Sequence, residues 1–525
     1  MTATPNLPFD DACYLALKAR DARFDGRFFT GVTSTGIYCR PVCRVRTPKR
    51  ENCRFFPHAA LAELAGFRPC LRCRPELAPG GGVPHPPAWS MQDASSILAG
   101  QAAALLDAPP SGSVAAQGIG PVAQRLGISD RHLRRIFEAR FGVSPLRYLQ
   151  TRRLLCAKQL LTDTRLPAAQ VARMSGFASV RRFNAVFLAQ YGLNPTQLRR
   201  DRRSASAPTP STSPQLPLTV VLSYRPPYDV AALLQFFQRR QLTGTELATL
   251  SPTQASLAST LSVALDGQRI SGWLTACFDA PRCRVRLTVS ESLLPALPQV
   301  MVRVRHLLDL DADPLAINAV LHNDFPESDG LRLPGTLDGF ELAVRAVLGQ
   351  QITVAAARTV CNRLVARFGE PITTPMTGLN RLFPSAQTLA NATGDDLGQL
   401  GIVKQRQGAI IALARAVADG QLTLHTGAPL APTLRDVLAL PGVGDWTAQY
   451  IAMRALGWPD AFPAGDVALH KALAVQGAPS PAKAALAAAS AWQPWRSYAV
   501  MRAWARLPDT APTGQATHQT SDGHG

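Results

Sequence analysis

The sequence of 525 residues lacks the marks of a membrane or secreted protein. No uncharged apolar run reaches the roughly 18 residues that a membrane-spanning helix needs. The N-terminus has no basic segment followed by an apolar one, so we expect no secretory signal. In a protein that stays in a reducing compartment, cysteines serve metal binding or catalysis more often than disulfide formation. We therefore expect a cytoplasmic protein without a membrane partner.

Acidic residues are scarce in the first two-fifths of the chain. Residues 1–203 carry 30 Lys and Arg against 13 Asp and Glu, whereas residues 204–525 carry 25 against 23. A positive field concentrated in one segment attracts polyanions, and nucleic acid is the commonest polyanion in a cytosol. A merely solubilising surface would spread its charge along the chain. The charge distribution therefore predicts that the first segment binds nucleic acid.

Two stretches rich in Pro, Gly, Ser and Thr, Ala78–Pro87 and Asp201–Pro217, are typical of linkers. A polar tail at 509–525 is expected to be disordered. The blocks between these stretches are 1–80, 88–203 and 217–508. The last block is long enough for two subdomains. The second linker predicts that the halves of the chain before and after it fold and act separately.

The first block holds two short cysteine pairs, Cys39-x3-Cys43 and Cys70-x2-Cys73. Pairs with this spacing deliver four thiolates tetrahedrally to one zinc ion. A domain of about 80 residues has a thin core, so a structural metal would also stabilise it. We therefore expect one Zn²⁺ and no organic cofactor. The spacing alone leaves a plain zinc ribbon as an alternative.

The segments around the pairs are more specific. Thr35–Cys43 (TGIYCRPVC) and Gly66–Cys73 (GFRPCLRC) resemble the N-terminal zinc domain of the Ada DNA-alkylation-repair regulators. The resemblance implies that Cys39 is both a zinc ligand and the stoichiometric acceptor of a methyl group from a DNA methylphosphotriester. Transfer would remove one negative charge from the site and so strengthen DNA binding. The arginines that could hold the phosphate backbone are Arg40, Arg44, Arg68 and Arg72.

The second block contains two helix-turn-helix patterns. In the first, Ser129 predicts the N-cap of a helix at Asp130–Ala139, whose apolar residues share one face and whose basic residues share the other. The second pattern spans Ala168–Gln190, and Ser144–Leu161 predicts a connecting helix. A helical bundle with solvated arginines would leave a similar pattern. We expect an all-α double helix-turn-helix domain at 88–203.

This block resembles the AraC-family DNA-binding domain, notably in Phe137-x4-Gly142 and in Gly176-Phe177-x5-Phe183. Arg suits guanine edges or phosphates, and Asn suits adenine. The resemblance implies contacts to double-stranded DNA from Arg131, Arg134, Arg135, Arg181, Arg182 and Asn184. A transcription activator of this kind is also expected to contact RNA polymerase.

The third block changes character along its length. Leu218–Ser223 is an apolar, β-like run, and Arg282–Val289 alternates in the manner of a strand. Beyond about Gly339 the pattern becomes helical. We therefore expect a mixed α/β subdomain at 217–330 and an all-α domain at 335–508, which makes the whole chain a multidomain α+β protein.

The most specific motif of this block is Leu440–Gly444 (LPGVG), a helix–hairpin–helix signature. Gly442 and Gly444 let backbone N–H groups at a helix N-terminus point at one DNA phosphate, and Leu440 belongs to the same DNA-contacting hairpin. Asp466 follows 22 residues after Gly444. By itself, Asp466 could simply cap the next helix.

The block as a whole resembles AlkA-type DNA-3-methyladenine glycosylases of the helix–hairpin–helix superfamily, with Ser223–Tyr228 and Pro494–Ala499 carrying the closer likeness. The resemblance implies that Asp466 is catalytic. It also implies that Trp446, Tyr450 and Trp504 line the base pocket, although tryptophans in this region could belong to the core. Gln351 occupies the position of the residue that is wedged into the DNA stack, where an apolar residue is more usual.

The sequence therefore predicts a bifunctional DNA alkylation-damage protein. Its front half would activate transcription after methyl transfer, and its rear half would hydrolyse alkylated purines such as 3-methyladenine from DNA. The place after the hairpin holds Trp446 rather than the lysine of bifunctional lyases, which favours a monofunctional enzyme. A bacterial, nucleoid-associated location would follow. The main alternative is a transcription regulator whose glycosylase-like block is catalytically inactive and only binds DNA.

Overall fold

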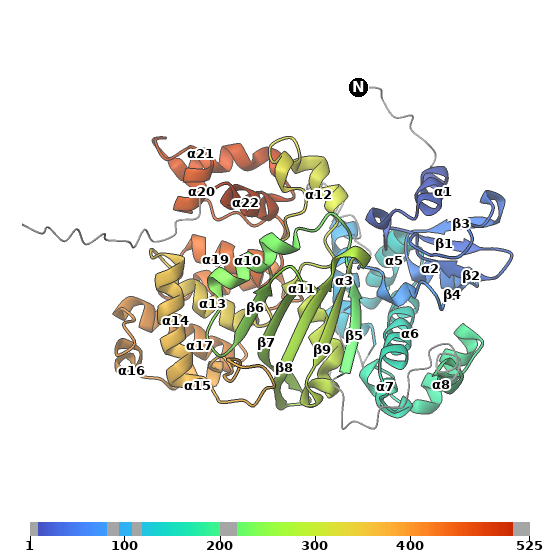
Figure 1. Ribbon diagram of the computed structural model, residues 1–525, viewed down its shortest axis with the longest axis horizontal. Helices are drawn as coiled ribbons and strands as arrows, with labels where there is room; N and C mark the ends of the chain where they lie inside the picture. Colours follow the sequence, from blue (N-terminus) through green and yellow to red (C-terminus); the bar gives the residue numbers. More distant parts are fainter. Residues whose placement is uncertain (1–8, 81–93, 108–117, 200–217, 508–525) are drawn as a thin grey trace, which may run out of the picture.

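The computed structural model describes residues 9–80, 94–107, 118–199 and 218–507. A small domain with one sheet is followed by a helical domain, a second sheet and a second group of helices (Figure 1). The expected fold class, a multidomain α+β protein with this order of parts, is confirmed. The predicted linker at 201–217, the tail at 509–525 and most of Ala78–Pro87 lie outside the described residues.

The first domain wraps two helices around a four-stranded sheet of order β3-β1-β2-β4. Its elements are α1 (Phe9–Ala19), β1 (Phe29–Val32), β2 (Ile37–Cys39), β3 (Cys53–Phe56), α2 (Ala59–Leu64) and β4 (Arg68–Pro69). Strands β2 and β4 are parallel, with Tyr38 opposite Pro69. Because a cysteine ends β2 and another follows β4, this register brings the two cysteine pairs to the same end of the sheet.

The second domain is all helical in the residues that the structure describes. It consists of α3 (Ala94–Asp107), α4 (Gly120–Arg125), α5 (Asp130–Phe141), α6 (Pro145–Asp163), α7 (Ala168–Met174) and α8 (Val180–Tyr191). The predicted cap at Ser129 is present, since its hydroxyl accepts from the His132 N–H, and the structure adds serine caps at Ser144 for α6 and Ser179 for α8. Each of α5 and α8 ends at a glycine with positive φ, Gly142 and Gly192.

A five-stranded antiparallel sheet opens the rear half, in the order β5-β9-β8-β7-β6. Its elements are β5 (Leu218–Ser223), α10 (Val230–Arg240), β6 (Glu246–Leu250), β7 (Ala255–Leu265), β8 (Gln268–Asp279), β9 (Arg284–Val289), α11 (Leu297–Leu307) and α12 (Pro314–Leu321). Both predicted strands are present. Strand β9 begins two residues later than expected because a 3-10 turn at Ala280–Arg282 precedes it.

The remaining helices form the second helical group. They are α13 (Gly339–Leu348), α14 (Val354–Phe368), α15 (Ala386–Ala390), α16 (Gly394–Gly398), α17 (Lys404–Ala418), α18 (Leu430–Leu438), α19 (Asp445–Arg454), α20 (Val467–Ala472), α21 (Pro481–Ala488) and α22 (Arg496–Ala505). No helix among the described residues is long and apolar enough to cross a membrane.

The two halves of the chain are packed together. One hydrophobic core runs without a break from α6, α7 and α8 through the five-stranded sheet to α22. Helix α6 lies along edge strand β5 (Figure 1), and the Gln159 side-chain amide donates to the Val221 carbonyl at 2.9 Å. The linker had suggested two bodies that act separately, and this arrangement differs from that expectation because apolar side chains of both halves share one interior.

Candidate functional sites

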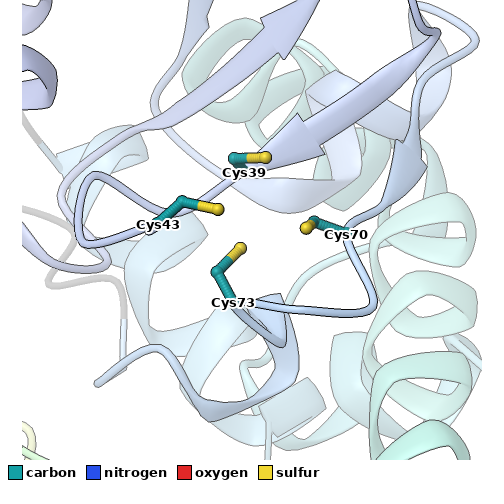
Figure 2. A group of neighbouring side chains, drawn as sticks. All are labelled: Cys39, Cys43, Cys70 and Cys73. Atoms are coloured by element: carbon teal, nitrogen blue, oxygen red, sulfur yellow. The ribbon is translucent and has the colours of Figure 1, made fainter. Parts of the chain in front are cut away.

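Four cysteine thiols meet at the end of the first sheet. The Sγ atoms of Cys39, Cys43, Cys70 and Cys73 all lie within 4.8 Å of one another. Figure 2 shows the four side chains pointing toward a common centre from the end of β2 and from the loops around it. The register of β2 and β4 explains the approach, because the Cys70 N–H donates to the Tyr38 carbonyl at 2.9 Å. The sequence-predicted cluster is therefore assembled.

The cluster has the chemistry of a closed zinc site. All four cysteines are free, and three of them are buried. Four mutually close thiols without a disulfide are the donor set that a tetrahedral structural zinc ion prefers, so the residues fit one Zn²⁺. Cys39 and Cys43, but not the other pair, also line a small cavity together with Leu17, Thr30, Val32, Val45, Thr47 and Pro48.

Arg40 does not lie where the sequence analysis placed it. Its side chain is 3 % exposed and donates from Nε to the Asp25 carboxylate at 2.8 Å and from one terminal nitrogen to the Cys73 carbonyl at 3.0 Å. The prediction of a phosphate contact is therefore wrong for Arg40, because a neighbouring carboxylate takes the guanidinium into the interior. Arg44 and Arg72 are exposed. Arg68 is exposed too, but it donates to the Tyr191 carbonyl of α8 at 3.3 Å.

The two helix-turn-helix units present the side chains that the sequence assigned to DNA. Leu133, Ile136 and Phe137 of α5 are buried, as are Phe183 and Phe187 of α8. The opposite faces carry the exposed side chains Arg131, Arg134, Arg135, Arg181, Arg182 and Asn184. Both faces are therefore basic and accessible.

Asp466 occupies a second candidate site, between two indole rings. Its carboxylate accepts from Trp446 Nε1 at 2.8 Å and from Trp504 Nε1 at 3.1 Å. It also caps α20 by accepting from the Leu469 N–H at 2.6 Å. The side chain is 9 % exposed. Asp466 is thus a helix cap, as the cautious interpretation allowed, but it is at the same time a buried carboxylate fixed by two aromatic donors.

The three aromatic residues assigned to a base pocket lie together. The rings of Trp446 and Tyr450 are stacked at 5.3 Å with planes 11° apart, and the Tyr450 and Trp504 rings are 6.5 Å apart. Sequence reasoning missed Arg454, whose guanidinium donates to the Tyr450 hydroxyl at 2.7 Å and lies 5.5 Å from the ring centre. Its spacing of four residues from Tyr450 on one helix face was the signal available.

The hairpin between α18 and α19 lies next to the aromatic cluster. Gly442 has a φ of +75°, which favours glycine, and Gly444 caps α19 with no atom within 4 Å of the position of a Cβ. Leu440 is half-buried against the core. Gln350 holds the preceding loop to the hairpin by donating to the Gly442 carbonyl at 3.0 Å. Gln351, the predicted wedge, is exposed and has a φ of +55°.

Comparison with known families assigns each part of the chain. Residues 12–76 match the metal binding domain of Ada, and residues 122–201 match a helix-turn-helix domain. Residues 219–338 match the AlkA N-terminal domain, and residues 344–497 match the HhH-GPD superfamily of base excision DNA repair proteins. A Mycobacterium tuberculosis protein named "Probable bifunctional transcriptional activator/DNA repair enzyme AlkA" is 37% identical over 503 residues, which cover 95% of this chain and 96% of that protein. The chain belongs to the same Ada–AlkA family.

Relatives of the two halves are also known separately. The Escherichia coli "DNA-3-methyladenine glycosylase 2" is 32% identical over 54% of this chain and 95% of its own length. The Escherichia coli "Bifunctional transcriptional activator/DNA repair enzyme Ada" is 35% identical over 27% of this chain and 35% of its own length. The Ada–AlkA chain thus joins parts that occur in separate proteins elsewhere.

Proposed function

We propose that this Ada–AlkA protein excises alkylated purines from DNA with its rear half and senses DNA methylphosphotriesters with its front half. The observation that carries the proposal is the Asp466 carboxylate, buried beside a helix–hairpin–helix motif and held by the indoles of Trp446 and Trp504. An isolated helix cap needs neither indole. The names of the protein's relatives, a DNA-3-methyladenine glycosylase and transcriptional activator/DNA repair enzymes, support base excision and a regulatory role.

Asp466 would act on the sugar of the flipped nucleotide. N-alkylation gives the purine a positive charge, so the base leaves with the electron pair of the glycosidic bond. Positive charge then develops on the sugar, and a fixed carboxylate stabilises that charge without reorganising. A water oxygen bonds to the anomeric carbon, and the proton that the water loses passes to the Asp466 carboxylate. The two indole donors hold the carboxylate in place, and the faces of Trp446, Tyr450 and Trp504 would receive the base by stacking and cation–π attraction.

The residues after the hairpin support hydrolysis without strand cleavage. A lyase needs an amine to attack the sugar, and Trp446 stands at the place where such a lysine would lie. The hairpin around Gly442 and Gly444 would hold one DNA phosphate on the N–H groups that begin α19. Gln351, exposed in the loop before α14, would fill the space that the flipped base leaves.

Cys39 would accept the methyl group in the front half. Zn²⁺, when bound, keeps thiols deprotonated near neutral pH. A Cys39–methyl bond forms as the methyl–oxygen bond of the phosphotriester breaks, and the electron pair stays on the oxygen of the resulting phosphodiester. The thioether has no route back, so each protein would react once. The cavity beside Cys39 and Cys43 supports this side of the cluster as the entrance.

The helix-turn-helix domain would read promoter DNA after this reaction. The exposed arginines of α5 and α8 suit phosphates and guanine edges, and losing one negative thiolate charge removes a repulsion toward DNA. Double-stranded DNA is the partner of both halves in this proposal. RNA polymerase is the further partner that transcription activation requires.

The decisive experiment compares base release from methylated DNA by the wild type and by Asp466→Asn under single-turnover conditions. We expect the rate to fall by on the order of 10²–10³, because the neutral amide no longer stabilises positive charge. DNA binding should stay close to the wild-type value, since the hairpin is unaltered. Wild-type rates in Asp466→Asn would contradict the mechanism. No base release even by the wild type would favour the regulator with an inactive glycosylase block.

A further inference from the structure

Arg225, in the segment between β5 and α10, lies at a joint between the two halves of the protein. Its side chain is fully buried. From the front half it binds the carbonyls of Asp25, Pro79 and Gly80, at 2.7, 3.4 and 2.8 Å. From the rear half it binds the carbonyls of Asp311 and Ala312, at 2.9 and 3.0 Å. A guanidinium has five N–H donors, and all five are used.

Further contacts surround this arginine. Arg27 of the front half forms an ion pair with Asp313 of the rear half at 2.8 Å, and the Gly80 N–H donates to the Asp311 carboxylate. Gly26 permits the close approach: it has a φ of +77°, and a Cβ there would lie 2.3 Å from the Pro79 carbonyl oxygen. The joint is therefore a polar contact with Arg225 buried at its centre, and it admits no larger residue at Gly26.

On the front side, the joint continues to the cysteine cluster through Asp25. This residue gives its main-chain carbonyl to Arg225 and its carboxylate to Arg40. Arg40 directly follows Cys39, its backbone N–H points to the Cys73 sulfur at 3.3 Å, and its guanidinium binds the Cys73 carbonyl. Only two buried side chains separate the thiols from Arg225.

On the rear side, the joint continues toward Asp466. The loop that gives Arg225 two carbonyls also contains Asp309, whose carboxylate accepts from the Tyr498 hydroxyl at 3.1 Å and from the Leu333 N–H at 3.0 Å. Tyr498 lies on α22, the helix that carries Trp504, and Trp504 donates to Asp466. Hydrogen bonds and one helix thus link the joint to the second site.

We propose that Arg225 couples the four-cysteine site to the glycosylase half, so that the state of one changes the stability of the other. If the cysteine cluster loosens, Arg40 and Asp25 lose their fixed positions. The hydrogen bonds from Arg225 to the carbonyls of the front half then weaken. A guanidinium that loses buried partners is costly, so the rear half is destabilised in turn. Such coupling is reciprocal by thermodynamic linkage. The inference goes beyond the proposed activities and does not depend on either of them.

A double-mutant cycle on the full chain tests the coupling. Six of the seven tryptophans lie between residues 218 and 507, so tryptophan fluorescence reports the unfolding of the rear half almost alone. Cys43→Ser removes one thiol of the cysteine cluster, and Arg225→Met removes the hydrogen bonds of Arg225 at the joint. We expect Cys43→Ser to lower the fluorescence midpoint by about 2–4 °C or more in the wild-type background and by much less in Arg225→Met.

The controls separate coupling from general damage. Arg23→Gln removes an exposed ion pair with Asp21 inside the front half and should leave the effect of Cys43→Ser unchanged. If Arg225→Met does not fold, Arg27→Gln opens the Arg27–Asp313 pair at the partly exposed edge of the same joint and replaces it in the cycle. Equal shifts in both backgrounds, or no shift of the fluorescence midpoint by Cys43→Ser, would overturn the proposal. Neither outcome would touch the catalytic assignments, because unfolding is measured without substrate.

Discussion

At the scale of the residue, the Asp466 carboxylate is not only buried but also held in place by hydrogen bonds. Three N–H donors converge on its two oxygens, from Trp446, Trp504 and the backbone of Leu469. Each hydrogen bond to a charged acceptor contributes more than one to a neutral acceptor. The carboxylate is consequently held in one orientation at the N-terminus of α20, where the sugar of the proposed reaction would contact it.

Replacing Trp446 by Phe separates the two roles of this side chain. Phenylalanine keeps an aromatic face for the base but has no N–H for Asp466. We expect the single-turnover rate of base release to fall roughly 10- to 100-fold, by the value of a hydrogen bond to a charged group, while DNA affinity changes little. Trp446→Ala is the comparison, since it loses both roles and should impair cationic bases further. An unchanged rate in Trp446→Phe would show that the indole N–H does not position the acid.

At the scale of the element, helix α19 aligns Trp446, Tyr450 and Arg454 on one face at intervals of four residues. Arg454 is 6 % exposed and is anchored by the carbonyls of Pro334 and Gly335, at 2.8 and 3.0 Å. It forms no ion pair with a carboxylate of the described residues. Burial raises the pKa of the Tyr450 hydroxyl, but the hydrogen bond from Arg454 and the charges of Arg454, Arg240 and Arg345 together outweigh burial and bring that pKa below its ordinary value. An unneutralised cation thus lies behind the proposed base pocket.

The charge of Arg454 should weaken the preference for cationic bases. If Tyr450 lines the pocket, a bound alkylpurine cation is repelled by this guanidinium across the ring. We expect Arg454→Gln to raise the ratio of cationic to neutral base release by roughly threefold or more, an estimate for two charges that are screened by protein and solvent. Arg454→Lys keeps the charge and should keep the ratio. The ratio is measured within one preparation, so partial unfolding does not affect it, and an unaltered ratio in the Gln variant would refute the effect.

At the scale of the whole molecule, buried polar groups join parts that the sequence separates. Glu63 of α2 joins the first domain to α6, because its carboxylate accepts from the Tyr38 hydroxyl at 3.1 Å and from the Thr151 hydroxyl of α6 at 2.8 Å. Arg125 of α4 reaches the Gly427 carbonyl of the rear half at 2.6 Å. Together with Arg225, these contacts hold the domains in one arrangement.

Glu63 should make the stability of this arrangement depend on pH. Burial raises the pKa of Glu63 from 4.5 to about 7. Between these values the unfolded chain has lost the proton that the folded chain keeps, so stability due to this group falls as pH rises. Glu63→Gln removes the titration. We expect the unfolding free energy of the wild type, relative to Glu63→Gln, to fall by on the order of 2–3 kcal/mol between pH 4.5 and pH 7.5. Urea unfolding at both pH values checks this, and parallel pH curves would contradict it.

Local patterns determined the fold class and the chemistry of this protein. The periodicity of the helices, the Ser129 cap of α5 and the strand at β5 are set by residues close together in the chain, so they could be predicted. The two cysteine pairs belong to the same class, because their short spacing lets both thiols of a pair reach the same metal ion. Family resemblance supplied the candidate roles of Cys39 and Asp466.

Contacts between distant residues were decided only by the tertiary structure. Arg40 and Arg44 look alike in the sequence, yet one is buried against Asp25 and the other is exposed, since Asp25 approaches only through the folded sheet. The position of the Arg454 guanidinium depends on hydrogen bonds to carbonyls of a segment more than a hundred residues away. The joint at Arg225 likewise brings together carbonyls from both halves of the chain, across a linker that alone would suggest independence. The sequence determined which groups exist and how each element forms, whereas the burial and pairing of charges depend on desolvation, which exists only once the chain has closed around them.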